Sequence, residues 1–130
     1  MTPQQIDLIR ASFAFLQPRL PELGGEFYAR LFATAPQLRP MFPREISRQA
    51  HALAAMLELI VKMIDMQDKL VPLIRYLGER HRVLKVRPEH YPPFTAALLW
   101  TLQRTLGDEF TPETREAWQA AFDFMAEHMK

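Results

Sequence analysis

Histidine is the residue type in this chain that is best suited to bind a transition metal. The chain has no cysteine, so a metal site would have to use histidine, carboxylate or methionine side chains. Of the four histidines, His81 shares one helical stripe with Leu73, Leu77 and Leu84. A polar imidazole among apolar neighbours needs a partner. One ring nitrogen could bind a metal while the other reaches the carbonyl of Leu77; a histidine that binds nothing is the alternative.

Length and composition describe one globular domain over residues 1–130. Hydrophobic residues make up 48% of the chain and charged residues 24%, which is typical of a folded protein. The formal net charge of +1 gives no cationic excess for nucleic acid, so no nucleic-acid partner is expected. No apolar stretch predicts a membrane span, and the N-terminus does not resemble a signal peptide. Together with the lack of cysteine, this favours a cytoplasmic location.

Proline placement and apolar spacing predict an all-α fold with about six main helices. Thr2 to Gln5 form a predicted capping box with proline at the first helical position. Gly24 and Gly25 are expected to allow close helix crossing. The helices are expected over residues 3–18, 21–34, 46–66, 69–84, 88–106 and from 112 onward, with a turn or 3₁₀ stretch over 35–44.

Several short motifs occur in an order that is typical of one protein family. They are Phe27-Tyr28, Pro36 with Phe42, Gln49 with Leu53, Leu77-Gly78-Glu79-Arg80-His81, His90-Tyr91-Pro92, and Leu106-Gly107 with Trp118. By their joint order and spacing, the whole chain resembles a single-domain bacterial haemoglobin, of the type related to the globin part of flavohaemoglobins. The resemblance implies a globin fold around one haem b (iron protoporphyrin IX), with a short or absent D helix.

The resemblance gives roles to residues on the two sides of the haem. His81 would be the proximal iron ligand, oriented by Leu77. Tyr28 and Gln49 would form the distal pair and donate hydrogen bonds to a bound ligand, each contributing about 1.5–3 kcal/mol, so slow oxygen release is expected. Leu53 would wall the pocket. The alternatives are a core-edge tyrosine, a solvated glutamine and an ordinary core leucine.

Further residues are implied to contact the haem. Phe42 would pack flat on the porphyrin, although a loop anchor in the core is the alternative. Val86 and Phe94 would be proximal-side contacts, Tyr91 matches a proximal tyrosine of the family, and Arg44 is a candidate partner for a propionate. A basic strip beside His81 would be a solvated face near the propionates or, alternatively, a docking surface for an acidic reductase. It comprises Arg75, Arg80, Arg82, Lys85 and Arg87.

The remaining histidines and the last helix show where this chain departs from the family. His51 should face away from the iron, His90 should cap or pack near a helix start, and His128 should lie in a fraying terminus. In flavohaemoglobins the proximal tyrosine works with a glutamate of the last helix, which has no counterpart here, and Phe122 stands where a tyrosine is common. Glu127 does not match that glutamate position. Strong peroxidase-like activation is therefore not expected.

The expected function is reversible binding of O2 and similar small ligands, namely NO, CO or sulfide. The family makes nitric oxide dioxygenation an expected activity, for which a separate reductase would be needed because 130 residues do not include flavin and nicotinamide domains. Storage, transport or protection without catalysis is the competing class. Two more classes stay open at this point: a haem-based gas sensor, and a haem-free helical bundle that binds a protein partner.

Overall fold

The computed structural model describes all residues from 1 to 130 and contains six α-helices and no strand. The prediction of an all-α fold with about six main helices is confirmed. None of these helices has the length and apolarity that a membrane crossing requires. In chain order they are α1 (Pro3–Leu16), α2 (Leu20–Thr34), α3 (Ser47–Met63), α4 (Gln67–Val83), α5 (Tyr91–Leu106) and α6 (Pro112–Met129), with 3₁₀ turns at Gln17–Arg19, Pro36–Met41, Pro88–His90 and Gly107–Glu109.

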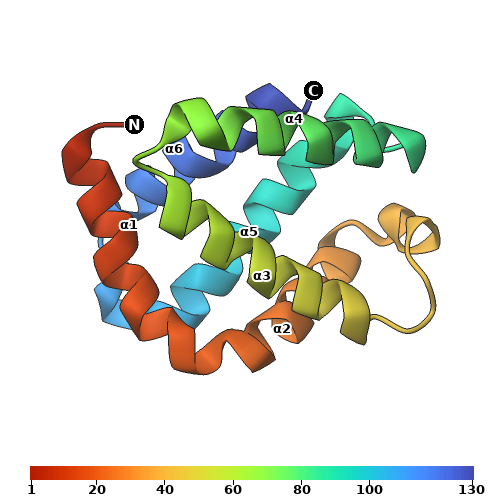
Figure 1. Ribbon diagram of the computed structural model, residues 1–130. Coiled ribbons are helices and arrows are strands. Elements are labelled where there is room, and N and C mark those ends of the chain that lie inside the picture. Colours follow the sequence, from red (N-terminus) through yellow and green to blue (C-terminus); the bar gives the residue numbers. More distant parts are fainter.

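The helices cross one another instead of lying side by side in a parallel bundle (Figure 1). Helix α2 packs on both α3 and α5, while α1 and α4 pack on α6. Helices α3 and α4 are joined by a short turn and diverge from it, with α4 running across the top of the view and α3 descending below it. This divergence leaves one face of α4 without a helix against it.

Side chains cap the ends of α1 and α6 as the sequence predicts. The Gln5 backbone N–H donates to the Thr2 hydroxyl over 3.1 Å, and the Thr2 N–H donates to the Gln5 side chain over 3.0 Å. This is the expected capping box. At the start of α6, the hydroxyl of Thr111 accepts from the Thr114 N–H over 3.2 Å. Both helices therefore begin at the positions that their sequences specify.

Helix α5 starts later than predicted. The sequence predicts a helix from Pro88, but the first three residues form the 3₁₀ turn and the α-helix begins at Tyr91. Pro92 and Pro93 have no N–H, so they cannot donate the i to i−4 hydrogen bonds that would extend the α-helix back to Pro88. His90 stabilises the turn, because its Nδ1 accepts from the Arg87 N–H over 2.9 Å. The expectation that His90 caps a helix start is confirmed.

Only one of the two glycines in α2 allows a close helix crossing. A Cβ atom at Gly24 would lie 2.6 Å from the carbonyl oxygen of Ala50 in α3. At Gly25 nothing lies within 4 Å of that position. The expectation is therefore confirmed for Gly24 and wrong for Gly25, which faces open space.

The interior is held together by a single large core with one buried polar link. The indole N–H of Trp118 in α6 donates to the hydroxyl of Ser12 in α1 over 2.8 Å, and both residues are buried. Phe122 and Met125 continue the buried face of α6, as predicted. His128 does not lie in a frayed end, because its ring packs 4.5 Å from that of Phe124. The apolar spacing of α6 extends to its last turn, which accounts for this order.

Candidate functional site

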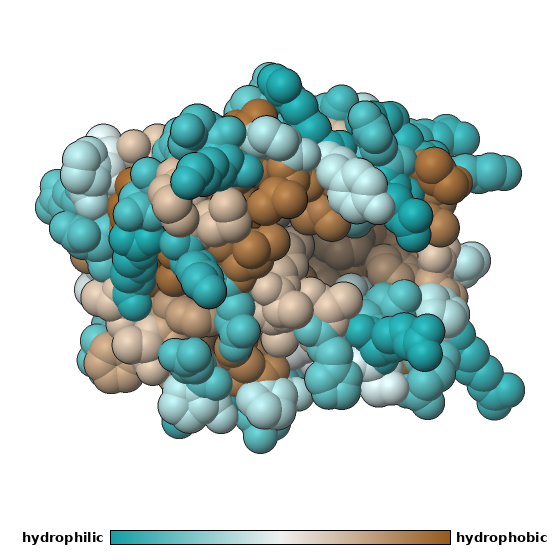
Figure 2. All heavy atoms as spheres, viewed as in Figure 1, coloured by the Kyte–Doolittle hydropathy of each residue, from teal (hydrophilic) through white to brown (hydrophobic).

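The surface between α3 and α4 is hollowed. Figure 2 shows a recess with hydrophobic walls below α4 and above α3, on the side of the molecule where these helices have diverged. A recess lined by apolar groups is costly to leave in contact with water. An apolar ligand that filled the recess would remove this cost.

Two neighbouring faces of α4 differ in how much protein covers them. Leu70 and Ile74 are almost fully buried. On the adjacent stripe Leu73 is 40% exposed, Leu84 is 70% exposed, and Leu77 and His81 are half-buried. The stripe predicted from the sequence is present, but no other helix covers it. An apolar stripe of this kind indicates that something other than the chain itself packs there.

His81 is oriented by its own helix. Its Nδ1 lies 2.6 Å from the carbonyl oxygen of Leu77. Because a carbonyl only accepts hydrogen bonds, Nδ1 is the protonated nitrogen and Nε2 of the neutral ring carries the free electron pair. Nε2 has no hydrogen bond to the protein. The predicted contact with Leu77 is confirmed, and the ring has the tautomer that a metal ligand needs.

Helix α4 is fixed in place by the end of α6. A Cβ atom at Gly78 would overlap the backbone of Met129, so the two helices touch at this glycine. One turn later, the guanidinium of Arg82 donates to the Met129 carbonyl over 2.9 Å. Arg82 thus caps α6, and it is also exposed, as expected for a member of the basic strip. These two contacts set the position from which His81 projects.

Tyr28 lies inside an aromatic cluster. Its ring is 4.8 Å from Phe27, 5.4 Å from Phe42 and 5.9 Å from Phe32, measured between centroids. The residue is only 7% exposed. Its hydroxyl makes no hydrogen bond with the protein, and burial raises the pKa of Tyr28 to about 12 because a phenolate would lose its hydration. The hydroxyl is therefore a neutral donor with no partner.

Phe42 connects the aromatic cluster around Tyr28 to α5. It is half-buried, and its ring lies 5.4 Å from Phe32 and 6.0 Å from Phe94. Phe94 in turn lies 5.5 Å from Phe27. The structure thus brings together three predicted site residues, Tyr28, Phe42 and Phe94, from three separate elements.

Arg39 positions the segment that carries Phe42. Its guanidinium donates to the carbonyls of Phe42, Pro43 and Arg44 at 3.4, 3.0 and 3.0 Å. It also stacks over the Phe32 ring, 4.8 Å from the centroid. This role is not predictable from the sequence, since an arginine that binds carbonyls of an irregular segment leaves no periodic signal. By satisfying three carbonyls, Arg39 holds a segment that has no helix of its own.

Gln49 carries the one buried side-chain polar atom without a partner. Its Oε1 is buried and makes no hydrogen bond, which costs about 1–3 kcal/mol. Leu53 lies one turn later on the same face of α3 and is buried. The expected distal role of Gln49 needs an amide N–H at this position, whereas the carbonyl end occupies it. Rotation of the amide by half a turn exchanges the two. A group that requires a partner thus faces the interior at the predicted position.

The remaining predicted residues surround this arrangement at greater exposure. Val86 is half-buried, and its N–H donates to the His81 carbonyl over 2.9 Å. Burial raises the pKa of Tyr91, an effect that the positive charge of Arg82 partly offsets. Arg44 is exposed. His51 is exposed and bound to the Ser47 carbonyl, in agreement with the expectation that it faces away.

The residues that α2, α3 and α4 present fit a haem. His81 offers a free imidazole nitrogen, and the uncovered stripe of α4 offers apolar area for a porphyrin. The buried, unpartnered Gln49 oxygen supplies a polar group in an otherwise apolar interior, and the Tyr28 hydroxyl, which has no partner in the protein, supplies another that still reaches solvent. A large planar cofactor that is apolar on its faces and takes one imidazole ligand matches this combination.

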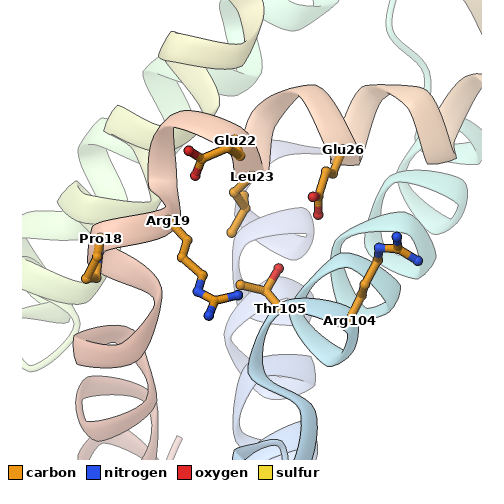
Figure 3. A pocket seen from close by; sticks show the side chains of 7 residues that line it. All are labelled: Pro18, Arg19, Glu22, Leu23, Glu26, Arg104 and Thr105. Carbon is orange, nitrogen blue, oxygen red and sulfur yellow. The ribbon is translucent and has the colours of Figure 1, made fainter.

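A second recess of about 470 Å³ lies elsewhere, between α2 and the end of α5. Figure 3 shows Glu22 and Glu26 projecting from α2, with Arg19 and Arg104 nearby. Leu23 is the single hydrophobic residue in its lining. No predicted site residue lines this recess, and its charged walls do not suit a porphyrin.

Crossed helices and a histidine-bearing stripe beside an apolar hollow define the class of α-helical haem proteins. The family model described as Globin matches residues 25–129. The chain belongs to the globin family, and this membership implies haem binding.

Curated relatives show the same relationship. The chain is 30% identical to the flavohemoprotein of Bacillus subtilis over 94% of its own length and 31% of that protein. It is 31% identical to the flavohemoprotein of Vibrio cholerae, over 98% of its length and 33% of that protein. The chain thus spans about a third of the length of the curated relatives it matches.

Solved structures of similar proteins support the fold. One is an engineered carbene transferase made from a Rhodothermus marinus protein provisionally assigned as a nitric oxide dioxygenase, with 30% identity, a TM-score of 0.87 and coverage of 98% of this chain and 89% of that one. Another is a bacterial globin from Campylobacter jejuni, with 29% identity, a TM-score of 0.85 and coverage of 97% and 91%. These similarities support binding of ligands at a haem in general.

The burial of Tyr28 predicts a loss of stability at alkaline pH. Its pKa is about 12 in the folded state against 10.0 for an exposed phenol. Between these values the unfolded state binds fewer protons, so the free energy of unfolding falls as the pH rises, by up to about 2–3 kcal/mol. Urea unfolding of the haem-free protein across this range should show that Tyr28→Phe lacks this part of the fall. The exposed Tyr76→Phe serves as control, and an equal fall in wild type and Tyr28→Phe would contradict the assignment.

Proposed function

We propose that this chain binds one haem b in the hollow between α3 and α4 and reversibly binds O2 and similar small ligands there, among them NO and CO. The observation that carries the proposal is the uncovered apolar stripe of α4, on which His81 has its Nδ1 bound to Leu77 and its Nε2 free. A cytoplasmic location stays a prediction of the sequence.

The residues that would hold the haem come from both sides of the hollow. His81 would bind the iron through Nε2, and the Leu77 carbonyl would keep its ring in the required tautomer and orientation. Phe42 and Phe94 would give apolar contacts, with Phe42 held in place by Arg39. Haem, when bound, would supply an iron atom able to take a diatomic ligand.

Tyr28 and Gln49 would act on that ligand. The hydroxyl of Tyr28 stays protonated at any physiological pH, because burial raises its pKa to about 12. It has no partner in the protein, so donating to a ligand breaks no hydrogen bond within the protein. Gln49 would rotate its side-chain amide so that an N–H donates to the same ligand, and its oxygen would then leave the buried position where it has no partner. Two donors in a site with little water would slow ligand release.

We also propose that the haem-bound protein converts NO and O2 into nitrate. The sum of one NO, one O2 and one electron is one nitrate ion, so each turnover needs an electron from a reductase outside these 130 residues. Tyr28 would hold O2 in one orientation, while the surrounding aromatic rings exclude water. Support comes from the similarity to flavohemoproteins and to the Rhodothermus marinus protein.

Oxygen release tests the two distal residues. Tyr28→Phe and Gln49→Leu should each release O2 about ten- to a hundredfold faster than wild type, since each loses a hydrogen bond of about 1.5–3 kcal/mol. Stopped-flow displacement of O2 by excess CO measures this rate on the reconstituted protein. Tyr76→Phe, an exposed tyrosine of α4, should match wild type. Equal rates in all four proteins would show that neither residue contacts the ligand.

Rapid mixing of the oxygenated protein with NO separates dioxygenation from simple binding. If the protein converts NO, the reaction runs much faster than spontaneous oxygen release and yields one nitrate for each oxygenated site. If NO only replaces O2, the reaction runs at the release rate and yields no nitrate. We expect the first result, with a slower reaction in Tyr28→Phe. The second result would leave reversible ligand binding as the function.

A further inference from the structure

A groove on the outer side of the distal helices ends at Tyr28. It has a volume of about 350 Å³ and lies between α2 and the start of α3. Gly25 and Ala29 of α2 line it where it is exposed, and Ala50 of α3, half-buried, faces them. Tyr28 is the one fully buried residue of its lining. The groove therefore leads from the solvent-exposed surface of α2 toward the residue that we place next to the haem ligand.

Gly25 is a residue for which helix packing gives no reason. Glycine inside a helix is less favourable than alanine, because it loses more conformational freedom on folding. The adjacent Gly24 is required by contact with Ala50, whereas a Cβ atom at Gly25 would meet nothing within 4 Å. A glycine at position 25 places no side chain in the groove and so leaves it wide. One turn later Ala29 adds only a methyl group to the same wall.

The far wall of the groove is rigid. Arg39 lines it with its guanidinium bound to three carbonyls and stacked on Phe32, which also lines it. A wall held by that many contacts does not collapse into the space. The groove thus lies between a wall held by several contacts and a wall of small residues.

Tyr28 supplies an independent sign that the groove serves a ligand. The residue is more than nine-tenths buried, and its hydroxyl has no hydrogen-bond partner in the protein but still reaches solvent, since Gln49 Oε1 is the one fully enclosed side-chain atom without a partner. Five of the eight lining residues are hydrophobic. Such a lining suits O2, NO or CO, which carry no charge and are weakly hydrated, better than it suits ions.

We propose that this groove is the access route by which small uncharged diatomic ligands reach Tyr28 from solvent. The inference rests on the proposed function, because it takes the haem to lie on the inner side of Tyr28. It adds that ligands pass between α2 and α3 beside Gly25, and that the rate of association is set at this point. A haem bound between α3 and α4 would itself cover the wider hollow of Figure 2.

The decisive variant is Gly25→Leu, which adds a large side chain to the groove at a position where a Cβ atom meets nothing within 4 Å. CO rebinding after flash photolysis of the ferrous protein should be slower by on the order of tenfold. Ala33→Leu adds the same side chain at an exposed position of α2 outside the groove and should rebind CO at the wild-type rate. Rebinding in Gly25→Leu within about twofold of wild type would overturn the proposal.

A second measurement tests the groove without haem. Xenon is an apolar probe that enters protein cavities. In haem-free protein with ¹³C-labelled alanine methyl groups, dissolved xenon should shift the Ala29 and Ala50 resonances in wild type and Ala33→Leu but not in Gly25→Leu. Absence of these shifts in wild type would overturn the proposal. If the protein bound no haem, the proposed function would fail at that step, and the two failures are therefore distinguishable.

Discussion

The contact between α4 and the end of α6 is the constraint on which the candidate site depends. At Gly78 the two helices touch through their backbones, and Arg82 caps the last turn of α6 by donating to Met129. The end of α6 therefore covers one face of α4. The adjacent face, with Leu77 and His81, is consequently left without a covering helix, on the helix that borders the hollow of Figure 2. A bound haem would complete the packing of α4, and its binding free energy would add to the stability of the folded state.

Residues that follow a helical period were predictable from the sequence. The six helices, the caps at Thr2 and Thr111, and the Leu77–His81 stripe all follow from spacing and local chemistry. The hydrogen bond from His81 to Leu77 was predictable for the same reason, because both atoms belong to one helical turn. The roles of Tyr28 and Gln49, by contrast, came from family resemblance and stay predictions.

Contacts between distant segments could not be predicted. Arg39 binds carbonyls of an irregular segment, and Arg82 caps a helix whose end lies far along the chain. Neither contact leaves a pattern in its own neighbourhood, so the cap that the exposed Arg82 forms on α6 could not be predicted. Gly24 and Gly25 show the same limit: they are adjacent in sequence, but one touches α3 and the other faces open space. Only the relative placement of two helices separates their roles.

The most direct test of the account is a haemin titration of the haem-free protein, followed by its absorption spectrum, in wild type and His81→Gly. The account predicts a Soret band that saturates at one haem per wild-type chain, and affinity lower by on the order of a hundredfold in His81→Gly, restored by added imidazole. His51→Gly, at an exposed position, should behave as wild type. Equal affinity and an unchanged spectrum in His81→Gly would contradict the central claim that His81 binds the iron.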